Sequence, residues 1–116
     1  MRVEQVHCHN WPDLEAPKDT SVLLDMYDLV DQLLDSSPGT LLVHCSAGVG
    51  RTGAFIALFK LIRDYEEEPE KPAIDLFSTV IEMRRARKKM VQKPVQYHYI
   101  LKCLADYVKG ETTLYA

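Results

Sequence analysis

The feature that most constrains this chain is its residues 44–53, which read His-Cys-Ser-Ala-Gly-Val-Gly-Arg-Thr-Gly. The apolar run Leu-Leu-Val at 41–43 comes directly before them and is bounded by turn residues, which is typical of a short buried strand. Apolar residues at helical spacing follow them. A strand, a tight glycine-containing turn and a helix are therefore expected in succession, and they indicate an α/β fold.

The turn at 45–50 has the composition of a phosphate-binding loop. Its two glycines allow successive backbone N–H groups to point at one centre, and the N-terminus of the following helix adds partial positive charge. The same field favours a thiolate, which predicts a lowered pKa and a nucleophilic sulfur for Cys45. Arg51 is suited to bind two phosphoryl oxygens, and the Thr52 hydroxyl is placed to donate to the sulfur. The alternative is a buried cysteine beside an ordinary glycine-rich turn.

The rest of the chain is predicted to be mainly helical. Apolar spacing predicts helices over 21–36, from 51 to beyond 62, over about 74–89, and from 94 to a stop at Gly110. Residues 3–9 alternate weakly and are interpreted as a second short strand. Expected inward side chains are Phe55, Ile56, Phe59 and Ile62 in the second helix, Ile74, Phe77, Val80 and Ile81 in the third, and Val95, Tyr99, Leu101, Leu104 and Val108 in the fourth, where Cys103 is also expected in the core.

Composition excludes several classes of protein. The 116 residues include 14 basic and 17 acidic side chains, a net charge of −3, which disfavours a nucleic-acid partner. No apolar run approaches the roughly 20 residues of a membrane helix. Three cysteines without close pairs argue against a disulfide framework and for a reducing compartment. His7, Cys8 and His9 alternate between two faces, and no Cys-x2-Cys spacing supports a metal site.

The ten residues at 44–53 match the signature loop of the cysteine-dependent protein tyrosine phosphatases. Trp11-Pro12-Asp13 resembles the mobile acid loop of that family, and Met-Val-Gln-Lys-Pro-Val-Gln-Tyr at 90–97 resembles its glutamine loop. The chain departs from the family pattern at Glu15, where a glycine is usual, and at Lys93, where a threonine is usual. The chain is identified as a member of this family, with specificity for phosphotyrosine.

The resemblance implies hydrolysis of phosphotyrosine in proteins through a cysteinyl-phosphate intermediate, without a metal or cofactor. It makes Cys45 the nucleophile and Arg51 the phosphate-binding arginine. Asp13 supplies the proton that the leaving oxygen needs and then acts as base, while Gln92 positions the attacking water. The phosphate-binding set comprises Cys45, Ser46, Ala47, Gly48, Val49, Gly50, Arg51, Asp13 and Gln92, supported by His44, Thr52, Gln96 and Trp11.

The resemblance also implies a central mixed sheet, truncated here and flanked by helices. It begins only near the acid loop, so residues 1–116 are expected to form the carboxy-terminal part of a catalytic domain. The upstream part, which walls the phosphotyrosine ring, is expected to be absent. That part or another chain would complete the sheet, and the isolated chain is expected to be marginally stable or oligomeric. The protein is expected to act in signalling in the cytoplasm, as a soluble protein or as the cytoplasmic part of a receptor.

Two other functions are open at this point. One is a truncated, non-catalytic fragment that binds phosphotyrosine or regulates another protein. The other is a dual-specificity phosphatase, a class of naturally short enzymes that lacks the pairing of an acid loop with a glutamine loop seen here.

Overall fold

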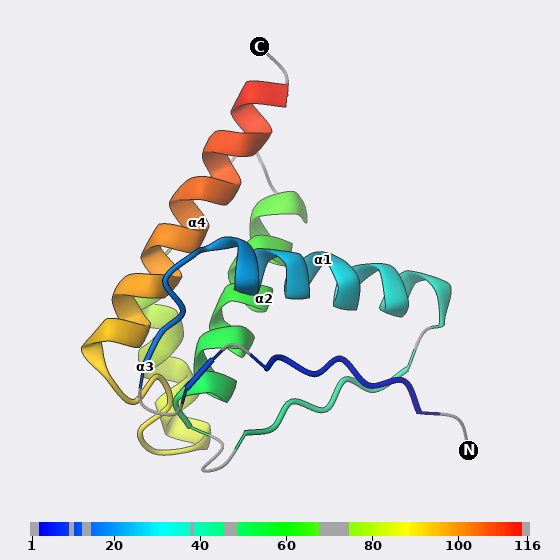
Figure 1. The fold of residues 1–116 in the computed structure, drawn as a ribbon. Helices are drawn as coiled ribbons and strands as arrows, with labels where there is room; N and C mark the ends of the chain where they lie inside the picture. The colour runs from blue at the N-terminus through cyan, green and yellow to red at the C-terminus, as the bar shows by residue number, and fades with distance from the viewer. Residues whose placement is uncertain are drawn as a thin grey trace.

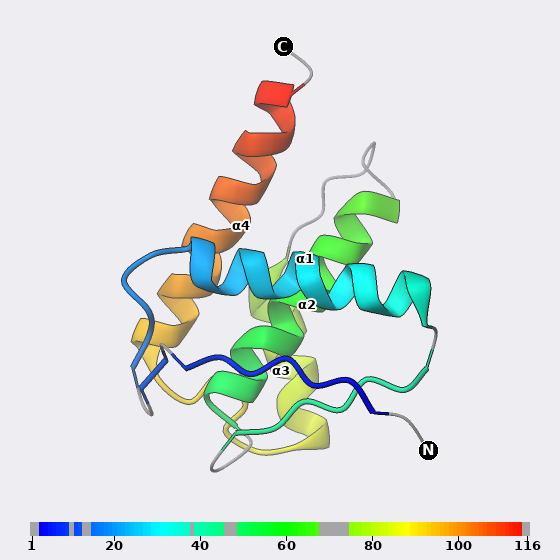
Figure 2. The ribbon, with the colours of Figure 1, turned by 45° about the vertical axis from the view of Figure 1, so that its right-hand side comes forward.

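A computed structural model describes residues 3–9, 11–12, 15–37, 39–45, 49–67 and 75–114. Within these residues the chain forms four helices, α1 (Ser21–Ser36), α2 (Arg51–Glu67), α3 (Leu76–Ala86) and α4 (Pro94–Leu114). Helix α2 contacts the other three, and α1 also contacts α4 (Figure 1). The extended segments 3–9 and 39–45 both pass beneath α1 (Figures 1 and 2). None of the helices in these ranges is long and apolar enough to cross a membrane.

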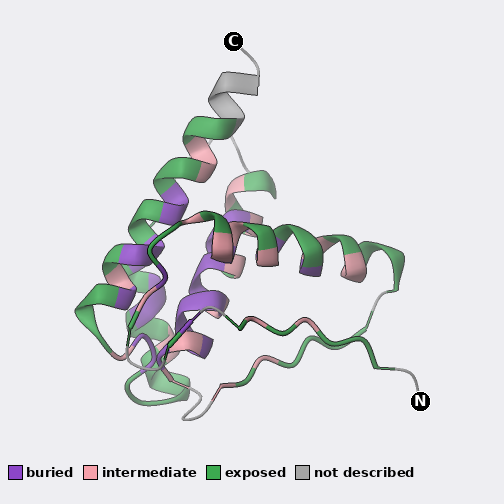
Figure 3. Cartoon of the chain, viewed as in Figure 1, coloured by how far each residue is buried: buried purple, intermediate pink, exposed green. Residues whose placement is uncertain are grey.

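Helix α2 is the centre of the core. Buried residues follow it along most of its length (Figure 3), because three helices pack around it. Phe55 and Ile62 are buried as predicted, whereas Ile56 and Phe59 are half-buried. The remaining buried residues of α2 are Thr52, Gly53, Ala54, Ala57, Leu58 and Leu61.

Helix α1 has the bounds that its sequence pattern predicts. The Asp19 carboxylate accepts the Ser21 N–H at 2.9 Å at its start, and this bond lowers the pKa of Asp19. At its end, the N–H of Ser37 donates to the Leu33 carbonyl at 2.9 Å. Its buried side chains are Leu23, Tyr27 and Val30, one stripe at helical spacing.

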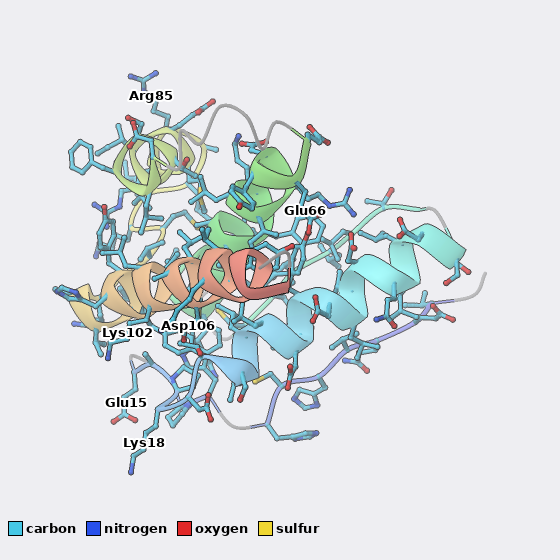
Figure 4. The ribbon with its side chains drawn as sticks, turned by 90° about the horizontal axis from the view of Figure 1, so that it is seen from above. Glu15, Lys18, Glu66, Arg85, Lys102 and Asp106 are labelled. Atoms are coloured by element: carbon cyan, nitrogen blue, oxygen red, sulfur yellow. The ribbon has the colours of Figure 1, made fainter. Side chains whose placement is uncertain are left out.

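Two hydrogen bonds fix the start of α1 against α4. The Tyr99 hydroxyl donates to the Asp19 carbonyl at 2.7 Å, and the Thr20 hydroxyl donates to the Asp106 carboxylate at 2.7 Å. Asp106 lies on the side of α4 that faces α1 (Figure 4). Cys103 is fully buried on the same helix, as predicted, and burial raises the pKa of its thiol to about 12.

The predicted inward face of α3 is partly wrong. The helix is shorter than expected and begins after Asp75, whose carboxylate accepts the Ser78 N–H at 2.9 Å. Phe77 and Ile81 are 66% and 40% exposed. Helix α3 packs on α2 through a narrow stripe, so only one side of it is covered. The buried residues are Leu76, Thr79 and the predicted Val80; Ile74 lies outside the described residues.

The predicted inward face of α4 is also partly wrong. Tyr99 and Leu104 are buried as predicted, but Val95 and Leu101 are 49% and 42% exposed. The buried stripe is instead formed by Gln96, Tyr99, Ile100, Cys103 and Leu104. Gly110 does not end the helix, which continues to Leu114. Its φ is not left-handed, and a glycine within a helix costs only about 1 kcal/mol relative to alanine.

The predicted α/β class, with a central mixed sheet and a strand before the turn, is wrong for the part of the chain that the structure describes. Helices are the regular elements there, and neither 3–9 nor 41–43 forms a strand. Leu41 and Leu42 are 39% and 84% exposed, whereas a central strand is covered on both faces. Two strands alone form only a marginal ribbon, so both segments stay extended without a ladder. Val6 and Cys8 still alternate in burial with exposed neighbours.

Candidate active site

The predicted phosphate-binding loop leads from an extended segment into α2. Cys45 is half-buried at the end of residues 39–45, and Arg51 is the first residue of α2, as predicted. Between them Val49 is half-buried and Gly50 is buried, while residues 46–48 lie outside the described ranges. His44 is exposed. The N-terminus of α2 therefore follows the loop directly and adds partial positive charge to it.

A hydrogen bond joins Arg51 to the predicted acid loop. Its Nη1 donates to the Trp11 carbonyl at 3.0 Å. The Trp11 side chain is buried, packs edge-on against Tyr99 and donates from Nε1 to the Glu15 carbonyl at 2.7 Å. These bonds hold both flanks of the loop next to Arg51. Asp13 lies outside the described residues. Glu15 does not have a positive φ.

The predicted glutamine loop lies against the phosphate-binding loop. The Val91 N–H donates to the Val49 carbonyl at 2.8 Å. Gln92, the next residue, is half-buried and lines an open hollow of about 370 Å³ together with Arg84, Lys89 and Lys93. Gln92, which is predicted to position water, therefore directly follows a residue that is hydrogen-bonded to the predicted phosphate-binding loop.

Gln96 connects all three segments. Its side chain is fully buried, its Nε2 donates to the Glu15 carbonyl at 3.4 Å, and its Oε1 accepts the Lys93 N–H at 3.1 Å. The same amide occupies the space beside Gly50, where an added Cβ would lie 2.8 Å from Nε2. An added side chain at position 50 would therefore displace the Gln96 amide, which contacts the acid loop, the phosphate-binding loop and the start of α4.

Thr52 is predicted to support the site by donating a hydrogen bond to the sulfur of Cys45. The residue is 5% exposed on the first turn of α2. Its hydroxyl oxygen is buried and makes no hydrogen bond within the described part of the chain. A buried hydroxyl without a hydrogen bond is unfavourable because it has lost its contacts with water. The Thr52 O–H is therefore available to donate to a group in the adjacent loop.

Gly53 is predicted to be the least replaceable glycine in the described part of the chain. An added Cβ would lie 2.5 Å from the Val91 nitrogen and 3.3 Å from the Met90 carbonyl carbon, both backbone atoms. Gly53→Ala is expected to lower the free energy of unfolding by about 1–3 kcal/mol, because backbone has to shift. The measurement is denaturant unfolding.

Gly110→Ala is the matched control, because open space surrounds that position within α4. It is expected to raise the free energy of unfolding by roughly 0.5–1 kcal/mol, the usual gain from removing a glycine within a helix. Equal effects of the two substitutions would contradict the close approach of α2 to the glutamine loop.

Two sets of contacts at this site are absent from the sequence-based interpretation. The Glu15 carbonyl accepts from both Trp11 and Gln96, and Arg84 binds the carbonyls of Met90 and Val91. Both sets use backbone carbonyls, which every residue possesses, so no residue pattern signals them. The family resemblance points to Arg84 and Arg87, within the basic residues of 84–89, as arginines near the active site, but it does not indicate which atoms they bind.

Comparison with known proteins shows the family. A family model described as protein-tyrosine phosphatase matches residues 1–106, and this chain belongs to that family. The chain is 41% identical over 109 residues to receptor-type tyrosine-protein phosphatase V of Rattus norvegicus, covering 92% of this chain and 6% of that protein. It is 38% identical over 111 residues to receptor-type tyrosine-protein phosphatase eta of Gallus gallus, covering 94% of this chain and 8% of that protein.

A solved structure is similar as well. The crystal structure of a protein tyrosine phosphatase of Trypanosoma brucei superposes with a TM-score of 0.74 at 27% identity, covering 86% of this chain and 34% of that one. The family prediction made from the three motifs is confirmed. The chain spans less than a tenth of the length of the two receptor-type relatives, so its own activity and partners are matters for proposal.

Proposed function

We propose that this chain carries the phosphoryl-transfer site of a protein tyrosine phosphatase, which hydrolyses phosphotyrosine in proteins when a further segment completes the site. The observation that supports this most strongly is the convergence of three distant segments. Arg51 binds the acid loop at Trp11, and Val91 of the glutamine loop binds Val49 of the phosphate-binding loop. Membership of a family of tyrosine phosphatases gives the reaction class.

In the first proposed step, the Cys45 thiolate attacks phosphorus while backbone N–H groups of residues 46–50 and the Arg51 guanidinium bind the equatorial oxygens. A sulfur–phosphorus bond forms and the bond from phosphorus to the phenolic oxygen breaks. Asp13 donates its proton to that oxygen, because a free phenolate is a poor leaving group. The products of this step are the tyrosine side chain and a cysteinyl-phosphate.

In the second proposed step, water attacks the cysteinyl-phosphate. Gln92 orients the water and Asp13, now ionised, accepts its proton. The sulfur–phosphorus bond breaks and Cys45 leaves as a thiolate, which the buried Thr52 hydroxyl stabilises by donating a hydrogen bond. Arg51 and Asp13 supply the positive charge and the proton, so this route uses no metal or organic cofactor.

Apolar side chains are exposed beneath α1, which indicates that a further segment is needed to cover them. Val3 is 74% exposed, and Leu42, three residues before Cys45, is 84% exposed. We propose that another part of the same protein, or another chain, covers this face and walls the phosphotyrosine ring. The second candidate function, a fragment that binds phosphotyrosine without hydrolysing it, applies where no such segment covers this face. We propose a cytoplasmic location, either as a soluble protein or as the cytoplasmic part of a receptor, and the similarity to receptor-type phosphatases favours the second of these.

The test compares phosphotyrosine and phosphothreonine peptides as substrates of the chain, of Cys45→Ser and of Cys8→Ser. Cys8 is half-buried outside the three converging segments and serves as the matched control. The proposal predicts selective phosphotyrosine hydrolysis that is lost in Cys45→Ser and kept in Cys8→Ser, with little turnover by the 116 residues alone and recovery when a longer form is used. Equal turnover of both peptides would indicate dual specificity. Binding without turnover in every form would indicate a non-catalytic fragment.

A further inference from the structure

The glutamine loop contains an unusual backbone conformation. Lys89 and Val91 have φ values of 64° and 59°, and they are the non-glycine residues with positive φ in the described part of the chain. A left-handed conformation brings Cβ close to the neighbouring carbonyl oxygen, and a β-branched side chain makes this worse. Such a conformation persists only where surrounding contacts enforce it, and such residues cluster at functional sites.

Arg84 provides those contacts from the end of α3. Its Nε donates to the Met90 carbonyl at 2.9 Å and its Nη2 donates to the Val91 carbonyl at 2.9 Å. One planar guanidinium thus binds two consecutive carbonyls, a geometry that the single ammonium group of lysine does not reproduce. Val91 is also 1% exposed, and its N–H binds Val49 on the other side.

These contacts bear directly on Gln92. The Val91 carbonyl belongs to the peptide unit that joins Val91 to Gln92, so the bond from Arg84 fixes the orientation of that unit. The Val91 N–H fixes the preceding unit against the phosphate-binding loop. Arg84 and Val49 together therefore fix the backbone of Val91, and this sets the position of the Gln92 Cα.

We propose that Arg84 is a positioning residue, which holds the turn at 89–91 with Lys89 and Val91 left-handed and thereby places Gln92 for the attack of water on the cysteinyl-phosphate. The proposal rests on the proposed function for its catalytic consequence. The structural part of the proposal, that Arg84 fixes the turn, does not depend on the proposed function. Arg84 acts through Gln92 and is not itself a catalytic residue.

The kinetic test compares Arg84→Met with Arg85→Met in a form of the protein that turns over phosphotyrosine peptide. Arg85 is exposed and points away from the molecule (Figure 4), so it is the matched control. Because misplacement by about 1 Å can cost up to ~100-fold in rate, we expect Arg84→Met to lower kcat about 10-fold. Only the second step uses Gln92, so kcat/KM should stay within about two-fold.

Two further variants separate positioning from general stability. Arg84→Lys should not restore kcat, because it cannot bind both carbonyls. Lys89→Gly, which removes one of the two left-handed side chains, should recover part of the lost kcat when it is combined with Arg84→Met. A parallel fall of kcat and kcat/KM together with a lower melting temperature would reduce Arg84 to a structural role and overturn the proposal.

Hydrogen exchange of the Val91 amide tests the turn itself and requires no turnover. Arg84→Met should accelerate this exchange roughly 10-fold or more, because local opening of the turn becomes easier, whereas Arg85→Met should leave it unchanged. Equal exchange in the two variants would overturn the proposal even if the protein is a phosphatase. Failure of the proposed function would be seen separately, as turnover that persists in Cys45→Ser.

Discussion

Replacing Cys45 by serine is expected to abolish phosphatase turnover while binding of phosphate or vanadate remains largely intact. A serine hydroxyl is not ionised near neutral pH, so the variant lacks the nucleophile that the first step needs. The backbone N–H groups and Arg51, which bind the oxygens, are unchanged. Hydrolysis of phosphotyrosine peptide by an active form of the protein measures the first effect.

Fluorescence of Trp11 reports the second effect. It is the single tryptophan of the chain, it is buried, and its carbonyl binds Arg51. Titration with vanadate should change its emission in both the parent chain and Cys45→Ser. Cys8→Ser should behave as the parent chain in both assays. Appreciable turnover by Cys45→Ser would assign the nucleophile to another residue.

Replacing Asp13 by alanine is expected to lower kcat by roughly 10²–10⁴-fold with little loss of substrate affinity, the range for one positioned proton donor. Substrate affinity is little affected because Asp13 protonates the leaving oxygen and does not contribute to substrate binding. The loss should be smaller for an aryl phosphate with an acidic phenol, because that leaving group needs less protonation. The alkaline limb of the pH–rate profile, which reports the protonated acid, should disappear.

Asp35→Ala is the control for this substitution, because Asp35 is exposed near the end of α1. It should leave kcat and the pH profile unchanged. Unchanged turnover in Asp13→Ala would mean that the proton comes from elsewhere, and an equal loss for both kinds of leaving group would mean that Asp13 acts in binding.

The helices could be predicted from the sequence to different degrees. The bounds of α1 and the start of α2 at Arg51 follow from local signals, namely apolar periodicity and turn residues at the ends. The buried faces of α3 and α4 depend on which neighbours cover them, and exposed Phe77 and Val95 show that an apolar residue at helical spacing is not always covered.

The sheet could not be predicted correctly because a strand is defined by its partners. The run at 41–43 has the composition of a buried strand, but Leu42 is largely exposed and no ladder forms within the described ranges. Local sequence carries the preference for extended backbone, and it carries no information on whether a neighbouring strand is present.

The connections within the candidate site could not be predicted from the sequence. The motif residues identify Cys45, Arg51 and Gln92 as neighbours in space, and the hydrogen bonds from Arg51 to Trp11 and from Val91 to Val49 are consistent with this. The bonds that hold the segments together end mostly on backbone carbonyls. Glu15, where the family usually has glycine, contributes such a carbonyl without a positive φ.

The most direct test of the phosphoryl-transfer proposal is to trap the covalent intermediate. An active form of the protein is mixed with phosphotyrosine peptide, quenched in acid within the first turnover and digested, and the peptides are mapped by mass spectrometry. The account predicts the mass of one phosphoryl group on Cys45, more of it in Gln92→Ala because the second step is slowed, and none in Cys45→Ser. Hydrolysis of the peptide without a phosphoryl group on Cys45, or with that group on another residue, would contradict it.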